Sequence, residues 1–232
     1  MILWEWLGLL KKDFFQKSLP ISIFFLCALV VYEKENFDFL FIFLISAAVV
    51  FWIFIVPFLL FTKKNFPGLI AVHLSVFMTF SSFYACLWSL SEGLLNILSI
   101  LLVVWIADIS AYFTGRFFGK SKLAPNISPK KTWEGVFGAV IANILFAWLS
   151  VKYEFGWFDQ VANNTNIYFV FFLVISATFV SVLGDLFQSL LKREAKVKDS
   201  GKLLPGHGGF YDRFDAVIAV SPFLTLSVKL TQ

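Results

Sequence analysis

Long apolar runs separated by short charged segments constrain this 232-residue chain more than any other feature. Hydrophobic residues make up 59% of the sequence and charged residues only 15%. Soluble domains are about 45–50% apolar, whereas a helix that crosses the roughly 30 Å hydrocarbon core of a bilayer needs about 20 apolar residues. Alternating segments typical of barrels are absent, and a chain in lipid must satisfy its own backbone hydrogen bonds. We therefore predict an all-α, polytopic transmembrane helical bundle.

The apolar runs predict about seven membrane spans. These are Ser18–Tyr32, Phe37–Phe61, Gly68–Leu90, Gly93–Thr114, Trp133–Ser150, Ile167–Leu191 and Phe214–Leu230. Connections rich in Lys and Arg alternate with connections that are poor in them, and the loops 115–132 and 192–213 are the most basic. The positive-inside rule places the basic loops in the cytoplasm. We expect a multi-pass protein of the plasma (inner) membrane whose polar clusters all face the cytoplasm.

Four aspartates lie at the predicted cytoplasmic ends of spans: Asp108, Asp185, Asp212 and Asp215. An ionised Asp inside a span costs about 2.5–3.5 kcal/mol on insertion scales, so its presence there suggests a function. Helical spacing places three pairs on shared faces: Asp212 with Asp215, Asp185 with Ser189, and Asp108 with Tyr112. Oxygen ligands without a Cys or His cluster favour Mg²⁺ or Ca²⁺. The alternative is that each aspartate caps a helix or pairs with a neighbouring base, namely Lys192, Arg193 or Arg213.

The segment SPKKTWEG, residues 128–135, predicts the start of a helix. Thr132 suits the N-cap position and Glu134 the first turn. Lys130 and Lys131 come just before the cap, and ammonium groups beside free helix N–H groups form an anion site. We therefore predict phosphate binding here. The alternative is that these lysines only set topology and contact anionic lipid.

Two further features bear on a ligand site and on helix packing. Residues 205–209, PGHGG, form a turn-rich loop in which Gly206, Gly208 and Gly209 allow the backbone to approach a ligand closely. Asn143 lies within a predicted span. We expect its amide to form hydrogen bonds between helices.

From Ser189 the chain reads SLLKREAKVKDSGKLLPGHGGFYDRFD. This segment resembles the signature of the phosphatidate cytidylyltransferases, the CDP-diacylglycerol synthases. The positions in register are Ser189, Lys192, Arg193, Lys198, Asp199, Gly201, Pro205, His207, Gly208, Gly209, Asp212, Arg213 and Asp215. Residues 108–135 and 184–193 resemble further stretches of the family, so the resemblance covers about residues 108–220.

The resemblance also suggests that helices are missing from this sequence. Members of the family usually carry two more apolar helices ahead of a Trp-Glu-Trp-like element, which residues 4–6 resemble. We therefore expect that two N-terminal helices are absent. Two extra crossings would leave the predicted orientation unchanged.

The resemblance implies that the chain transfers a cytidylyl group from CTP to phosphatidate, giving CDP-diacylglycerol and pyrophosphate in phospholipid biosynthesis. It implies Mg²⁺ as cofactor, membrane lipid and a second copy of the chain (a homodimer) as partners, and no nucleic acid. Residues 1–107 would form N-terminal transmembrane helices, and residues 108–232 the catalytic transmembrane region.

The resemblance also implies roles for individual residues. The implied catalytic residues are Asp185, Asp212, Asp215, Lys192 and Arg193. The implied substrate-binding residues are Lys130, Lys131, Ser189, Lys198, Asp199, His207, Gly208, Gly209 and Arg213. The implied metal ligands are Asp185, Asp212 and Asp215, with Asp108 as support. Because the phosphate of phosphatidate is already anionic at neutral pH, no general base is needed, and we expect His207 to organise its loop or bind phosphate.

Two other functions fit parts of the pattern. A CTP-dependent lipid kinase, such as a polyprenol kinase, would use similar acidic and basic groups but would release CDP rather than pyrophosphate. A cation transporter or channel would usually carry its ionisable groups near the middle of the membrane. The aspartates of this chain lie at helix ends beside lysine-rich loops, which favours anionic substrates.

Overall fold

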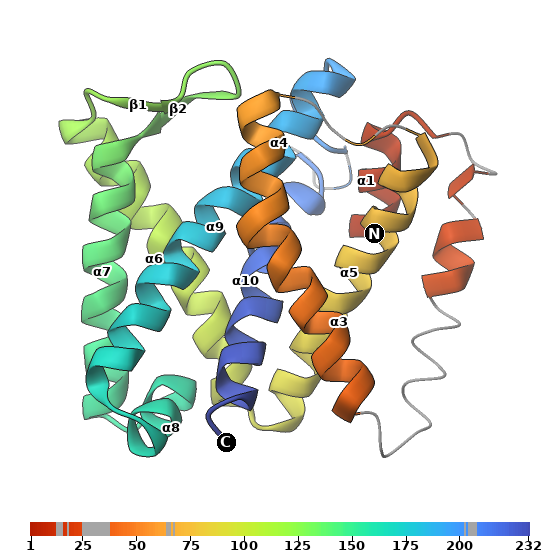
Figure 1. Ribbon diagram of the computed structural model, residues 1–232. Coiled ribbons are helices and arrows are strands. Elements are labelled where there is room, and N and C mark those ends of the chain that lie inside the picture. Colours follow the sequence, from red (N-terminus) through yellow and green to blue (C-terminus); the bar gives the residue numbers. More distant parts are fainter. Residues whose placement is uncertain are drawn as a thin grey trace.

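The computed structural model describes residues 1–12, 16–17, 19–24, 38–63, 66, 68–201, 203 and 208–232, and shows a helical bundle (Figure 1). Its helices are α1 (Ile2–Leu9), α3 (Asp38–Val50), a π-helical turn η1 (Phe51–Ile55), α4 (Val56–Thr62), α5 (Gly68–Ser91), α6 (Leu94–Phe118), α7 (Trp133–Lys152), α8 (Gly156–Asn164), α9 (Ile167–Ala195) and α10 (Tyr211–Lys229). Two short strands, β1 (Lys122–Ala124) and β2 (Ser128–Thr132), form an antiparallel hairpin.

Five helical segments in the described part of the chain are long and apolar enough to cross a membrane: Leu40–Thr62, Gly68–Ser91, Leu94–Phe118, Trp133–Lys152 and Ile167–Ala195. This confirms a polytopic helical membrane protein. The predicted span Phe214–Leu230 corresponds to α10, whose first turns carry three charged residues and which is not among the five. Most of the predicted span Ser18–Tyr32 lies outside the described residues. The count of about seven spans therefore stays a prediction.

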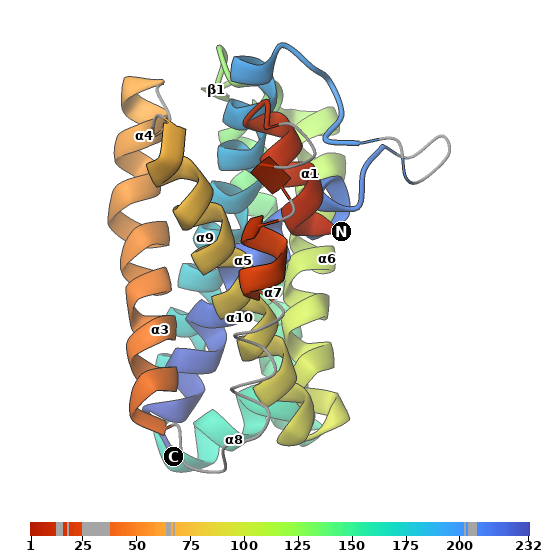
Figure 2. The ribbon, with the colours of Figure 1, turned by 90° about the vertical axis from the view of Figure 1, so that its right-hand side faces the viewer.

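The basic connections lie at one end of the bundle. Figures 1 and 2 show the hairpin, the end of α9, the end of α4 and α1 at this end, and α8 and the C-terminus at the opposite end. The loops 115–132 and 192–213 are therefore brought together, as the alternating charge pattern predicted. We call this end of the molecule the polar end.

Three short elements were not predicted from the sequence. The expected loop 115–132 is in fact the last turn of α6 followed by the β1–β2 hairpin, in which Lys122 pairs with Thr132. The helices α1 and α8 were also missed. Eight or nine residues are too few to form an apolar run that spans a membrane, so length and hydropathy alone did not identify these helices.

Buried polar contacts and close helix approaches fix the helices that carry the polar end. The Asn143 amide nitrogen on α7 donates to the Val103 carbonyl on α6 at 3.1 Å and to the Thr178 hydroxyl on α9 at 2.9 Å. The predicted interhelical role of Asn143 is thus confirmed. Gly184 on α9 faces the backbone of α10, where an added Cβ would lie 2.8 Å from the Asp215 carbonyl oxygen.

We predict that Gly184→Ala destabilises the bundle. The new methyl group would push α10 away from α9, and overpacking of this kind costs about 1–3 kcal/mol. The better helix propensity of Ala than of Gly offsets this loss of stability by at most about 1 kcal/mol. Thermal unfolding in detergent should show a lower transition temperature for Gly184→Ala. In the matched control Gly8→Ala, also within a helix, the new Cβ meets only the flexible end of Lys17, so the transition temperature should stay the same or rise. Equal transitions for the two variants would contradict this packing.

Candidate active site

A cleft of about 390 Å³ lies at the polar end of the bundle, where α6, α7, α9, α10 and the hairpin meet. Four aspartates and three lysines line it: Asp108, Asp185, Asp212, Asp215, Lys130, Lys131 and Lys192. Tyr112, Ser128, Thr132 and Ser181 complete the polar lining. The structure thus brings together all four candidate aspartates from three helices, and both residues of the predicted pairs Asp108–Tyr112 and Asp212–Asp215 line the cleft.

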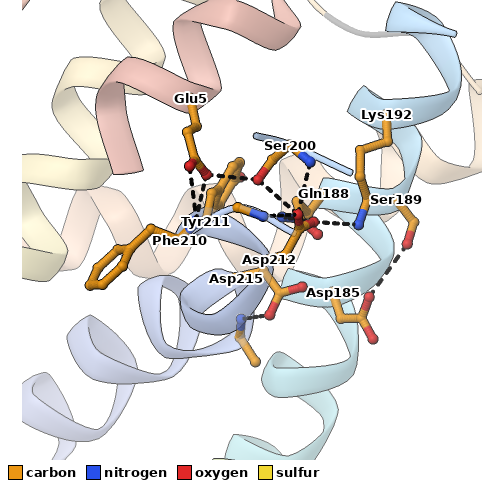
Figure 3. A network of polar contacts seen from close by, with 12 residues as sticks. Glu5, Asp185, Gln188, Ser189, Lys192, Ser200, Phe210, Tyr211, Asp212 and Asp215 are labelled. Atoms are coloured by element: carbon orange, nitrogen blue, oxygen red, sulfur yellow. Dashed lines mark hydrogen bonds and ion pairs between the residues drawn. The ribbon is translucent and has the colours of Figure 1, made fainter. Parts of the chain in front are cut away.

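Two of the aspartates, Asp185 and Asp215, lie next to each other in the cleft (Figure 3). The Asp185 carboxylate forms an ion pair with Lys131 at 2.7 Å and accepts a hydrogen bond from the Ser189 hydroxyl at 3.4 Å. One Asp215 oxygen accepts the backbone N–H of Ala216 at 2.8 Å. Because carboxylates repel one another at short range, a cationic group is needed among them. The Lys131 ammonium is one such group.

Asp212 is held more firmly than the other aspartates (Figure 3). Its Oδ1 atom accepts from the Lys192 ammonium at 2.8 Å and from the Gln188 amide at 3.0 Å. Its Oδ2 atom accepts from the N–H groups of Ser200 at 2.8 Å and Gly209 at 2.9 Å, and from the Ser200 hydroxyl at 3.0 Å. Burial alone would raise the pKa of the Asp212 carboxyl, but the hydrogen bonds from Lys192, Gly209 and Ser200 hold that pKa below its ordinary value. Asp212 lies in the first turn of α10, just before the predicted span that begins at Phe214. Its hydrogen bonds link α10 to α9 and to Ser200 and Gly209 between the two helices.

The three lysines reach the cleft from two sides. Lys130 and Lys131 lie on β2, and Lys192 lies on α9. The Thr132 hydroxyl accepts the Gly135 N–H at 3.2 Å, so the predicted N-cap of α7 is confirmed. The start of α7 also lines the cleft, through Thr132 and Gly135. Ammonium groups beside a helix N-terminus form a setting in which an anion is stabilised.

Other predicted site residues lie outside the lining of this cleft. The Arg193 guanidinium donates to the Ile127 carbonyl at 3.2 Å and so ties the hairpin to α9. Ser189 borders the cleft through its contact with Asp185. Lys198, Asp199 and Arg213 are exposed. Gly208 and Gly209 are not part of the cleft lining, but both lie against the Asp212 carboxylate, to which Gly209 donates its N–H. His207, Pro205 and Gly206 fall outside the described residues.

The donor chemistry of the cleft bears on the predicted metal. Among the described residues, no three His, Cys, Asp or Glu side chains converge closely enough to form a metal-binding group. The acids of the cleft nevertheless offer only oxygen ligands, which Mg²⁺ prefers. Asp212 already receives five hydrogen bonds, whereas Asp108, Asp185 and Asp215 keep more of their acceptor capacity. Metal binding by these aspartates stays a prediction.

Sequence reasoning missed three residues around Asp212: Glu5, Gln188 and Ser200. Gln188 is fully buried and donates to Asp212. Its position, four residues before Lys192, places both side chains on one face of α9 and could have identified it. Glu5 is a buried carboxylate on α1 that accepts from the Ser200 hydroxyl at 2.8 Å. An acid between two tryptophans in an otherwise apolar segment was the only local signal for Glu5.

Comparison with known proteins adds two findings. A family model described as the Cytidylyltransferase family matches residues 1–231. Curated proteins named phosphatidate cytidylyltransferase are similar to part of the chain. The Haemophilus influenzae protein is 44% identical over 134 residues, which are 58% of this chain and 46% of that protein. The Pseudomonas aeruginosa protein is 43% identical over 135 residues (58% and 47%), and the Bacillus subtilis protein 42% over 141 residues (60% and 49%). The chain thus spans about half the length of the curated relatives it matches.

Proposed function

The chain belongs to the Cytidylyltransferase family, and from this premise we propose that it transfers the cytidylyl group of CTP to phosphatidate. A phosphate oxygen of phosphatidate attacks the α-phosphorus of CTP. The bond from that phosphorus to the oxygen bridging the α- and β-phosphates breaks, and pyrophosphate leaves. The products are CDP-diacylglycerol and pyrophosphate. The matched relatives carry this activity in their names.

The cleft at the polar end is the observation that carries the proposal. Its lining combines four aspartates, on α6, α9 and α10, with three lysines, on β2 and α9, and α6 and α9 are two of the candidate membrane spans. A reaction between two phosphate-bearing substrates requires cationic groups that hold mutually repelling anions in line. It also requires a site at the membrane surface, since one substrate is a lipid. The cleft meets both requirements, and the acyl chains of phosphatidate would stay in the bilayer.

The lysines of the cleft would bind the phosphate groups. Lys130, Lys131 and Lys192 would contact phosphate and pyrophosphate oxygens, and the start of α7 would stabilise their charge. Arg193 would act by holding the hairpin that carries two of these lysines. The family resemblance is the support for substrate contacts by Ser189, Lys198, Asp199, His207, Gly208, Gly209 and Arg213.

The cleft offers the oxygen donors that Mg²⁺ prefers, and binding the ion would have to draw its carboxylates closer together than they lie in the structure. Asp108, Asp185 and Asp215 would hold it, because these three carboxylates line the cleft and keep free acceptor capacity. When bound, the ion would neutralise negative charge on the reacting phosphates. Lys131, now paired with Asp185, would be freed to contact a phosphate oxygen. Asp212 would hold the α9–α10 connection and orient Lys192.

Orientation and assembly complete the proposal. The bundle would lie in the plasma membrane with its polar end facing the cytoplasm, because the basic connections gather at that end and basic loops stay cytoplasmic. CTP would then reach the cleft from the cytoplasm. We also propose that the chain works as a homodimer, which the family resemblance supports.

We predict that the purified chain in detergent releases pyrophosphate from CTP only when both phosphatidate and Mg²⁺ are present. Asp215→Asn should abolish the release, because this change removes a charged oxygen ligand from the cleft. Asp159→Asn, the same chemical change in α8 at the opposite end of the bundle, should leave it intact. Release of CDP instead of pyrophosphate, or no release by a folded preparation, would contradict the proposal.

A second prediction separates the roles of Asp215 and Asp212. If Asp215 is a ligand, Asp215→Glu should raise the Mg²⁺ concentration for half-maximal activity by about 10- to 100-fold, since the longer side chain misplaces the carboxylate. Asp212→Asn should lower the rate and leave the Mg²⁺ concentration for half-maximal activity within about twofold of wild type, because Asp212 orients Lys192 rather than the ion. Titration of pyrophosphate release with Mg²⁺ measures both. The opposite pattern would assign the metal to Asp212.

A further inference from the structure

Glu5 is a carboxylate that the chain buries almost completely. It is only 4% exposed, on a helix whose other residues are nearly all apolar. Its Oε1 atom accepts the N–H of Phe210 at 3.0 Å, and its Oε2 atom accepts the N–H of Tyr211 at 2.8 Å and the Ser200 hydroxyl at 2.8 Å (Figure 3). A buried carboxylate is costly unless such donors surround it. The three neutral donors therefore fix where Glu5 can lie.

Glu5 supplies the N-terminal cap of α10 from the other end of the sequence. The residue before α10 is Phe210, whose apolar side chain cannot cap the helix, and α10 has no side-chain cap of its own. The two N–H groups that Glu5 binds lie 205 and 206 residues from it in sequence. A negative charge at a helix N-terminus is also favoured by the helix dipole. Glu5 thus satisfies the N–H groups of Phe210 and Tyr211 at the start of α10, as Thr132 satisfies the Gly135 N–H in the first turn of α7.

The glycines of the α9–α10 connection make room for this carboxylate. A Cβ atom added at Gly209 would clash with Glu5 and with the Ser200 hydroxyl, and one added at Gly201 would clash with Glu5. The Gly209 N–H is donated to Asp212. In this arrangement the glycines leave room for Glu5 and the Asp212 carboxylate, and the N–H groups of Gly209, Phe210 and Tyr211 bind these two carboxylates rather than a substrate phosphate.

Ser200 couples Glu5 to Asp212. Its hydroxyl lies 2.8 Å from Glu5 Oε2 and 3.0 Å from Asp212 Oδ2. A hydroxyl has a single hydrogen, so it can donate to only one of the two carboxylates at a time. Any change at Glu5 therefore alters the hydrogen bonding of Asp212, and through Asp212 that of Lys192 in the cleft.

Aromatic packing holds α1 in the position that this contact requires. Trp6 is 1% exposed, stacks on Tyr211 with ring centroids 5.1 Å apart, and meets the edge of Phe187 at 5.7 Å. These contacts dock α1 on α10 and α9 at the polar end (Figure 2). Glu5 and Trp6, neighbours in sequence, thus both contact Tyr211, the first residue of α10.

We propose that Glu5 is a positioning residue for the cleft. It fixes the α9–α10 connection and the start of α10, and so places Asp212 and its partner Lys192, without touching a substrate itself. The proposal rests on the proposed function for its kinetic consequence. Its structural consequence, the protection of the amides that Glu5 and Asp212 bind at Ser200, Gly209, Phe210 and Tyr211, is independent of the reaction.

The test compares Glu5→Gln with Glu92→Gln, the same substitution at an exposed glutamate near the opposite end of the bundle. Glu5→Gln keeps the shape of the side chain but replaces one accepting oxygen with an NH₂ group. That group cannot accept a hydrogen bond, so at least one of the donors Phe210, Tyr211 and Ser200 loses its partner. Misplacement near a reacting centre costs up to about 100-fold, so we expect kcat/KM for pyrophosphate release to fall by about 10- to 100-fold. Hydrogen exchange of the amides of Ser200, Gly209, Phe210 and Tyr211 should speed up in Glu5→Gln, while Glu92→Gln matches the wild type in both measurements.

A double-mutant cycle distinguishes positioning from simple destabilisation. Because Glu5 acts through Asp212, Glu5→Gln in an Asp212→Asn background should lower kcat/KM by less than about threefold more. A full additional loss would overturn the proposal, as would a Glu5→Gln variant with wild-type rate and exchange. If Glu5→Gln does not fold, Ser200→Ala is tested in the same cycle, with the same expected outcomes. If the wild-type chain releases no pyrophosphate, the proposed function fails, and unchanged exchange in Glu5→Gln would separately overturn the positioning role of Glu5.

Discussion

The carboxylate of Asp212 holds together the elements on which the cleft depends. It accepts hydrogen bonds from Gln188 and Lys192 on α9 and from Ser200 and Gly209 in the connection to α10. Charge-assisted hydrogen bonds are stronger than neutral ones, and little water competes for them in a half-buried site. Ser200 and Gly209, on the chain between these helices, are thereby fastened to α9 and α10. Lys192 and Asp215, which line the cleft with Asp212, lie on the same two helices.

Lipid explains why this chemistry lies at one end of the molecule. Helices satisfy their backbone groups internally, but charged side chains within the hydrocarbon region are costly. Asp108 and Asp185 lie in the halves of α6 and α9 nearer the polar end, and Asp212 and Asp215 lie in the first turns of α10, so all four are on helices with fixed spacing. Two of the lysines lie on a hairpin instead, which Arg193 ties to α9. The acidic groups of the cleft are thus held by helices, and the basic groups reach it from the hairpin on one side and from α9 on the other.

Features with a local signature could be predicted from the sequence, and features made by distant residues could not. Apolar runs identified five of the spans that the structure describes, the Ser-Pro-Lys-Lys-Thr pattern identified the Thr132 cap, and helical spacing placed Asp212 and Asp215 on one face. The contact of Glu5 with α10 leaves no periodic pattern, because its partners lie 205 and 206 residues away. The hairpin was missed because its strands of three and five residues are too short and too polar to produce a hydropathy signal.

The origin of the phosphate that enters the lipid product tests the central claim most directly. The chain would be incubated with phosphatidate, Mg²⁺ and CTP carrying a radioactive label in either the α- or the γ-phosphate, and the lipid fraction would then be counted. Our account predicts label in the lipid only from α-labelled CTP, because the attack falls on the α-phosphorus. Label from γ-labelled CTP would show phosphoryl transfer instead and would contradict cytidylyl transfer at this cleft.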